Sequence, residues 1–284
     1  MEVNSRRRSP TYSQIVGKLW FSRQRRDGMA SQSPLKAKPL RNPGDSIDEE
    51  IRRLTDDKLP EPFFFASGFA LLAMMEWFGY LTHSPRHPIL FTGVALVACI
   101  VAVWRVWRIR GRYKQLKLGR DGERCVGQFL ERLRDGGGQV FHDVPAETFN
   151  LDHVIISPHG IYAVETKTFS KPSPRAAVVV EGDSLLVAGR RPDRDPIKQV
   201  AGAARWLSDQ LETTTGKKFS VRGVVVFPGW FVEQRTPRGS IWVLEPKALP
   251  AFIENEPAVL ASSDVALAAF HLSRYIRSEV AKVA

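Results

Sequence analysis

The fold is decided by one stretch, NLDHVIISPHGIYAVETK, which runs from residue 150 to residue 167. Two apolar runs rich in β-branched residues flank the turn Ser157–Gly160, and this pattern predicts a hairpin of two strands. Side chains alternate across a strand, so Glu165 and Lys167 project from the same face. Asp152 stands near the start of the partner strand, from where its side chain can reach that face.

This hairpin brings two carboxylates and one ammonium group together at the mouth of an apolar sheet. Buried charges are costly unless they pair or hold a metal. Hard divalent cations such as Mg²⁺ or Mn²⁺ take oxygen ligands, so Asp152 and Glu165 are candidate metal ligands. Lys167 would orient or deprotonate a water for attack on a phosphodiester. The alternative is a structural ion pair of Lys167 with Glu165 or Asp152 on a half-exposed sheet face.

Matching motifs surround the hairpin in a fixed order. They are GRDGE at 119–123, DHV at 152–154, GIYAVETK at 160–167 and DPIKQ at 195–199. With this order and spacing, residues 116–245 resemble the nuclease-related domain family (NERD), a branch of the PD-(D/E)XK nuclease superfamily. The resemblance implies a restriction-endonuclease-like α/β core, in which a central mixed sheet is flanked by helices.

The resemblance also implies a role for five residues. Glu123 is the acid of the first core helix, Asp152 and Glu165 are metal-binding carboxylates, Lys167 is the catalytic lysine, and Gln199 faces the site from the next helix. Glu123 equally fits an acid favoured in the first turn of a helix, and Gln199 alone fits a solvated helix residue. The sequence departs from the family pattern at Thr168–Pro172, where members often carry a small polar residue and Gly.

Periodicity along the rest of this region predicts an α/β domain over residues 116–284. The expected helices cover 121–134, 196–212, 247–254 and 264–282, and the expected strands cover 139–144, 150–156, 161–167, 178–180, 185–187, 221–227 and 241–244.

Two long apolar runs precede this domain. Residues 63–81 contain one charge, Glu76, and residues 89–104 contain none. About 20 apolar residues span a bilayer core as a helix, and aromatic residues at the ends of both runs suit its interfaces. We therefore predict a transmembrane hairpin within 61–108, with spans at about 63–82 and 88–107. The alternative is a pair of buried helices in a globular core.

The charges around these runs predict their orientation. Seven Lys or Arg residues occur from 105 to 120 without an acid, whereas the loop 82–88 carries only Arg86 and two histidines. The positive-inside rule then places both termini in the cytoplasm, as in a multi-pass protein of the inner cell membrane. The basic flank lies at the bilayer and suits anionic lipid head groups.

The remaining composition concerns partners and the N-terminal region. The net charge is +11. Several basic residues flank the candidate site and suit nucleic-acid phosphates, with DNA favoured over RNA: Arg175, Arg190, Arg191, Arg194 and Lys198. A solvated basic face is the alternative.

Two cysteines without zinc-ligand spacing predict neither a disulfide framework nor a zinc site. Residues 1–60 read as a basic, partly disordered region with a short helix at 46–58, and Met29 is an alternative start.

Two hypotheses follow from the sequence. The first is a membrane-anchored nuclease-like protein that hydrolyses phosphodiester bonds of nucleic acid with a divalent metal at the cytoplasmic face. The second is a catalytically silent, membrane-anchored module with a nuclease-like fold that binds nucleic acid or protein independently of Mg²⁺. A small channel is disfavoured, because two helices line a path only in an oligomer.

Overall fold

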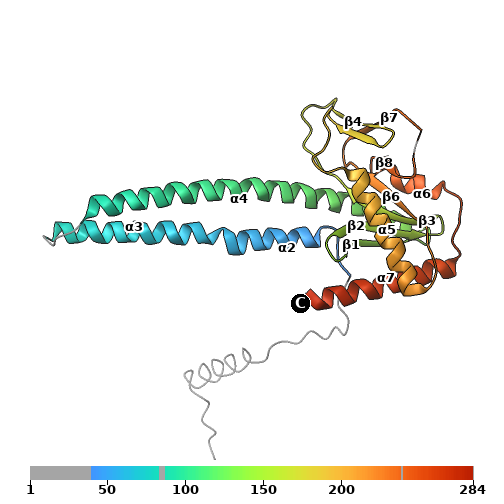
Figure 1. Cartoon of the computed structure of the whole chain (residues 1–284), viewed down its shortest axis with the longest axis horizontal. Coiled ribbons are helices and arrows are strands. Elements are labelled where there is room, and N and C mark those ends of the chain that lie inside the picture. The colour runs from blue at the N-terminus through green and yellow to red at the C-terminus, as the bar shows by residue number, and fades with distance from the viewer. Residues whose placement is uncertain (1–39, 83–86, 238, 284) are drawn as a thin grey trace, which may run out of the picture. The chain divides into compact units, whose positions relative to one another are not determined.

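The computed structural model describes residues 40–82, 87–237 and 239–283, so the predictions for residues 1–39 and for Arg86 fall outside it. Figure 1 shows the arrangement of the elements. The helices are α2 (Asp45–Arg53), α3 (Pro60–Leu81), α4 (Pro88–Leu130), α5 (Pro196–Thr215), α6 (Leu249–Glu254) and α7 (Ser262–Val283), with a π-helical turn at Leu54–Lys58 and a 3₁₀ turn at Glu131–Arg134. The strands are β1 (Gln139–Pro145), β2 (Asn150–Ser157), β3 (Gly160–Thr166), β4 (Ala177–Glu181), β5 (Ser184–Val187), β6 (Val221–Val226), β7 (Phe231–Gln234) and β8 (Trp242–Leu244).

A mixed five-stranded sheet forms the centre of the domain, which confirms the predicted α/β class. Its order is β1-β2-β3-β6-β8, with antiparallel pairing up to β3 and parallel pairing from β3 to β8. The predicted hairpin of β2 and β3 is present, and Ser157 pairs with Gly160 at its turn.

Helices cover both faces of this sheet, so apolar side chains on both sides of β2 and β3 are buried. One face packs on α5 and α7 through Val154, Ile156, Leu207, Leu211, Leu272 and Ile276. The other face packs on α4 and α6 through Val126, Leu130, Ile155, Tyr162, Val224, Leu249 and Ile253. Strands buried on both faces read as near-continuous apolar runs, which is why this pattern was visible in the sequence.

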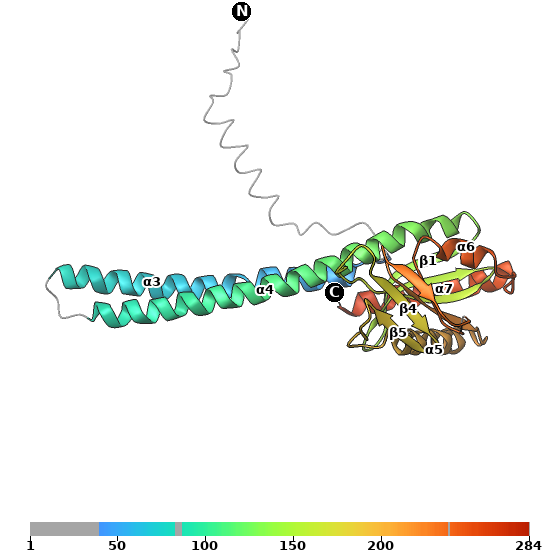
Figure 2. The same ribbon diagram turned by 90° about the horizontal axis from the view of Figure 1, so that it is seen from above.

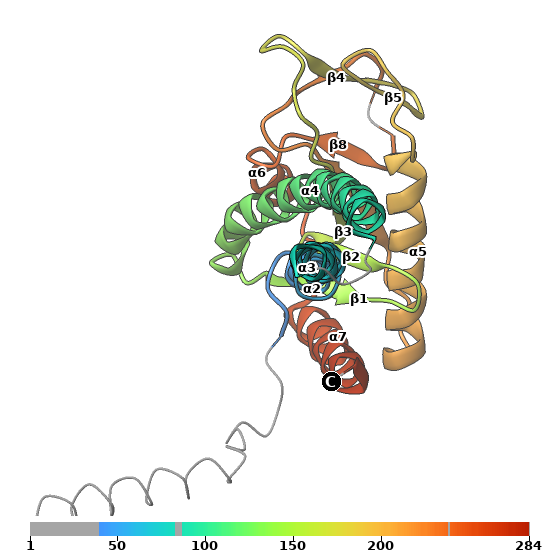
Figure 3. The same cartoon turned by 90° about the vertical axis from the view of Figure 1, so that its left-hand side faces the viewer.

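A second, three-stranded sheet has the order β5-β4-β7. The predicted hairpin of β4 and β5 is present, and β7, which was not predicted from the sequence, pairs in parallel with β4. An apolar cluster that includes Val178, Ile197, Val200, Phe227 and Trp230 packs this small sheet against α5 and the end of β6. Figure 3 shows the small sheet and α7 at opposite ends of the domain.

Helix α4 is one continuous helix of 43 residues, where the sequence predicted two separate helices. Its middle section packs on α2, with Leu116 against Ile51 and Leu54. Ion pairs join the same two helices, at 2.7 Å between Arg112 and Glu50 and at 3.1 Å between Arg120 and Asp48. The neighbouring helix α2 therefore supports the section of α4 between the predicted span at 88–107 and the predicted helix at 121–134.

Helices α3 and α4 run side by side as a hairpin (Figure 2). By length and composition both are apolar enough to cross a membrane, and 11% of each apolar window is buried. The indole Nε1 of Trp77 donates to Thr92 Oγ1 at 2.9 Å, and Glu76 Oε2 accepts the backbone N–H of His87 at 3.1 Å. These bonds connect the two helices near their short link.

Candidate active site

The end of β3 carries the centre of the candidate site. The backbone N–H of Lys167 donates to Val226 O at 2.9 Å, which continues the β3–β6 ladder one residue beyond β3. The regular pleat keeps Glu165 and Lys167 on one face, as predicted. Lys167 Nζ donates to Glu165 Oε1 at 2.6 Å, and the Glu165 side chain is buried.

Gln199 reaches the same two groups from α5. Asp195 caps this helix by accepting from Ile197 N at 3.0 Å, and Pro196 occupies its first position. Gln199 lies in the first turn, where its Oε1 accepts from Lys167 Nζ at 2.9 Å and its Nε2 donates to Glu165 Oε1 at 2.6 Å. The structure thus closes a triangle of hydrogen bonds among three of the five residues singled out from sequence.

Asp152 lies beside this triangle on β2. Its Oδ2 accepts the backbone N–H of Thr166 at 2.6 Å, the residue between Glu165 and Lys167. This bond holds the Asp152 carboxylate against the backbone of β3. The β1–β2 pairing skips Asp152 and Asp143, which stand opposite each other between the pairs His142–His153 and Val144–Leu151.

Glu123 projects from α4 and is 8% exposed. A close approach of α4 to the end of β3 brings it there, since a Cβ at Gly122 would lie 2.2 Å from Thr168 Oγ1. A backbone hydrogen bond from Gly44 reaches the Glu123 carboxyl group. Gly122 is therefore required by packing, and Glu123 is more than an acid in a first helical turn, because α4 begins far upstream at Pro88.

Three carboxyl groups influence one another in this site. Burial, followed by the charges of Asp143 and Glu165, raises the pKa of Glu123 to about 8. Burial, followed by the charges of Glu165 and Glu123, raises the pKa of Asp152 well above its usual range. Burial also raises the pKa of Glu165, and Lys167 opposes that rise. The site therefore holds more acidic groups than its single lysine can neutralise.

A family model matches the part of the chain that contains this site. Residues 118–228 match the family model described as NERD: Nuclease-related domain. The chain carries a nuclease-related domain. This domain contains all five candidate residues, and it extends from the end of α4 through β6.

A solved structure is similar to part of the chain. It is titled "The structure of Pyrococcus Furiosus SfsA in complex with Ca2+", and it is 17% identical with a TM-score of 0.20. The match covers 58% of this chain and 53% of that chain, so the chain spans about half of that protein's length. No curated protein matches the chain.

One buried acid beside the candidate site of the nuclease-related domain was not predicted from the sequence. Asp143 on β1 is 1% exposed and has a positive φ of 48°. It accepts hydrogen bonds from Arg41 Nη1 at 2.9 Å, Ser46 N at 2.8 Å, Ser46 Oγ at 2.6 Å and Asn150 Nδ2 at 3.0 Å. These bonds fasten residues 41–46 to the domain and place Gly44 against Glu123. The available signal was an acid inside the apolar run of residues 140–144.

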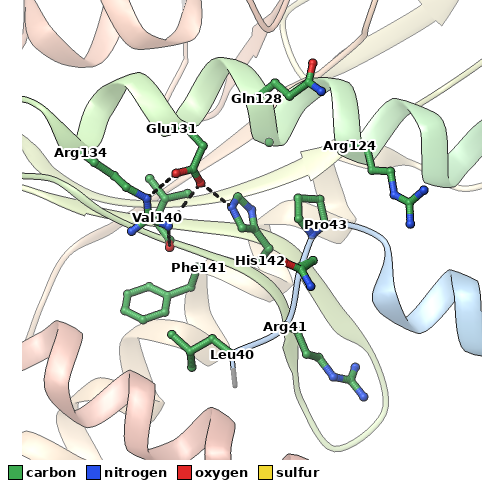
Figure 4. Close-up of a pocket in the computed structure, with 12 residues that line it drawn as sticks. Leu40, Arg41, Pro43, Arg124, Gln128, Glu131, Arg134, Val140, Phe141 and His142 are labelled. Carbon is green, nitrogen blue, oxygen red and sulfur yellow. Dashed lines mark hydrogen bonds and ion pairs between the residues drawn. The ribbon is translucent and has the colours of Figure 1, made fainter. Parts of the chain in front are cut away.

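A cavity of about 540 Å³ lies on the other side of the same attachment, between α4, β1 and residues 40–43. Figure 4 shows Glu131 between Arg134 and His142 in this cavity. Its three arginines are all paired: Arg41 with Asp143, Arg124 with Asp48 and Arg134 with Glu131. The five candidate residues do not line it, so this cavity is distinct from the candidate site of the nuclease-related domain.

The raised pKa of Glu123 predicts how stability depends on pH. Folded Glu123 keeps its proton up to about pH 8, whereas an unfolded glutamate loses it near 4.5. Without metal, the free energy of unfolding should therefore fall as pH rises through this window, by at most roughly 5 kcal/mol for this group. Thermal unfolding of the full chain in EDTA, at several pH values, measures the fall.

The variant Glu123→Gln should reduce this pH dependence, because glutamine does not titrate. Asp152 and Glu165 act in the same direction, so part of the dependence should remain. Glu254→Gln, at an exposed position on α6, is the matched control and should behave as wild type. Equal pH dependence in wild type and Glu123→Gln would count against a protonated Glu123.

Proposed function

We propose that this protein is a membrane-anchored nuclease that hydrolyses phosphodiester bonds of nucleic acid with a divalent metal, DNA being favoured over RNA. The observation that carries the proposal is the hydrogen-bonded triangle of Lys167, Glu165 and Gln199, with Asp152 and Glu123 beside it, inside a nuclease-related domain. The mixed sheet with helices on both faces agrees with a restriction-endonuclease-like core.

The donor set fits a hard divalent cation. Burial raises the pKa values of Asp152 and Glu165, and the charges of Glu165 and Glu123 add to the rise at Asp152. A bound Mg²⁺ or Mn²⁺ would offset this excess of negative charge. Asp152 and Glu165 would hold the cation together with water. No cluster of three or more His, Cys, Asp or Glu side chains suited to a metal occurs in the described parts of the chain. When bound, the cation would polarise a phosphoryl oxygen and offset the charge that develops on it.

Lys167 is held in position for the same reaction. An ammonium group has three donors, and Lys167 uses two of them on Glu165 and Gln199. The third N–H remains for the attacking water or for a phosphate oxygen of the substrate. In this scheme Gln199 is a positioning residue, because it fixes both Lys167 and Glu165 without touching substrate.

The apolar hairpin provides the proposed anchor. Its side chains are mostly exposed, which suits lipid better than the interior of a globular core. The basic section of α4 that follows Trp107 agrees with a cytoplasmic exit, and thus with a cytoplasmic nuclease-related domain near anionic lipid head groups.

Cleavage by the purified full chain in detergent micelles tests the proposal. Single- and double-stranded DNA and RNA are incubated with Mg²⁺, with Mn²⁺ or with EDTA. We expect cleavage that requires metal and is lost in Asp152→Asn, since asparagine keeps the acceptor for Thr166 N but removes the ligand charge. Asp209→Asn, an exposed acid on α5, is the matched control. Metal-independent binding without cleavage by wild type would instead favour the silent binding module.

A further inference from the structure

A second cleft, of about 630 Å³, opens beside the candidate site. One wall is the loop of residues 169–172 and the other is the loop of residues 187–193. The first wall begins two residues after Lys167, which limits the separation of the two Cα atoms to about 7 Å. The second wall leads into α5, where Gln199 bonds to Lys167 at 2.9 Å. Both walls are thus connected along the chain to residues proposed to act on the phosphodiester.

Two aromatic residues, Trp230 and Phe169, line this cleft, and Trp230 holds the backbone of Phe169 in position. Trp230 is 2% exposed, and its Nε1 donates to Phe169 O at 3.2 Å. The Phe169 ring stacks on Phe227, with centroids 6.2 Å apart and an angle of 18° between the planes. Phe169 nevertheless remains 36% exposed. A ring supported from behind and open in front is a surface on which an unpaired base can stack.

The charges at this cleft are available to a ligand. Arg190 and Arg191 are exposed and form no ion pair with any residue in the described ranges, whereas every arginine in the cavity of Figure 4 is paired with a carboxylate. Asp193 is the one carboxylate in the lining, and Lys171 of the facing loop lies 5.3 Å from the centre of the Trp230 ring. Unpaired guanidinium groups suit phosphate oxygens, which they bind through two parallel N–H donors.

We propose that this cleft binds an unpaired strand of nucleic acid next to the scissile phosphate, with a base stacked on Phe169 and phosphates held by Arg190 and Arg191. The inference rests on the proposed function and deepens it, because it defines the substrate as single-stranded at the site. A stacked base must leave its helix first, so a duplex presents no equivalent face. The cleft volume is in the range of sites for single small ligands, which suits one nucleotide.

The test is equilibrium binding of a fluorescein-labelled DNA strand of roughly 12 nucleotides and of its duplex, measured by anisotropy. The full chain is used in neutral detergent with EDTA, so the measurement does not depend on cleavage. We expect the single strand to bind more tightly than the duplex. Phe169→Leu, which keeps the apolar contact with Phe227 and removes the ring, should weaken single-strand binding roughly tenfold.

The double variant Arg190→Gln/Arg191→Gln tests the phosphate contacts. Log affinity falls with log salt, and the double variant should make this negative slope shallower by about 1.4, which corresponds to two single-strand phosphates. Arg277→Gln on α7, at the opposite end of the domain from the small sheet, is the matched control and should leave that slope unchanged (Figure 3).

Three results would overturn the cleft assignment: tighter binding of the duplex, unchanged affinity of Phe169→Leu, or equally tight binding of an acidic peptide of the same charge. The last result would identify a protein partner. Failure of the nuclease proposal is distinguishable from these. Strand binding that depends on Phe169 in a chain that never cleaves supports the cleft and contradicts only the activity, whereas cleavage without a Phe169 effect contradicts only the cleft.

Discussion

Replacing Lys167 by glutamine should lower the rate of metal-dependent cleavage on the order of a thousandfold. Lys167 is the cation that hydrogen-bonds both Glu165 and Gln199, and its third donor faces the substrate in the proposed site. Glutamine keeps similar length and a hydrogen-bonding group but removes the positive charge. Single-turnover cleavage at saturating metal measures the loss without a contribution from product release.

The neighbouring residue Gln199 provides the graded comparison. Gln199→Ala leaves the Lys167 charge in place and removes one of the bonds that hold it, so we expect a smaller loss, of roughly tenfold. Loss of the lysine charge also leaves Glu165 without the interaction that opposes the rise of its pKa. Thermal unfolding of both variants separates an effect on folding from an effect on rate. Cleavage by Lys167→Gln within threefold of wild type would contradict the assigned role.

The local parts of the fold were predictable because they leave a local pattern. The β2–β3 hairpin combines two apolar runs with a four-residue turn, and both strands are buried on both faces. The order of the motifs also placed Glu165, Lys167 and Gln199 near one another, and the structure joins them by hydrogen bonds. Their catalytic roles remain a prediction that the cleavage experiments test.

The parts that were missed depend on distant partners. Continuity of α4 depends on α2, whose Asp48 lies 72 residues before Arg120. Strand β7 is four residues long and exists through parallel pairing with β4, which no periodicity in residues 231–234 reveals. Arg41 lies 102 residues from Asp143, so its bond to this buried acid leaves no mark within a sequence window.

Asp143 is the residue at which this distant attachment can be tested most strongly. Asp143→Ala should lower the free energy of unfolding by about 3 to 5 kcal/mol, because it leaves buried donors without their acceptor. Arg41 would keep only a longer contact with Glu49, at 3.6 Å, and Ser46 would lose two bonds. For a domain of this size the unfolding temperature should fall by roughly 10 °C.

Asp143→Asn separates the charge of this residue from its backbone conformation. Asparagine tolerates the positive φ of 48° at this position and keeps one acceptor oxygen, so its loss of stability should be less than half that of alanine. Asp183→Ala, an exposed residue of the β4–β5 turn, is the matched control and should change the unfolding temperature little. Hydrogen exchange supplies the local measurement. In Asp143→Ala, residues 45–53 should lose protection from exchange more than β2 and β3 do, because Asp143 accepts the hydrogen bonds that join this helix to the sheet. Uniform loss of protection over the whole domain would show instead that Asp143 supports β1 itself and that the attachment of α2 is incidental.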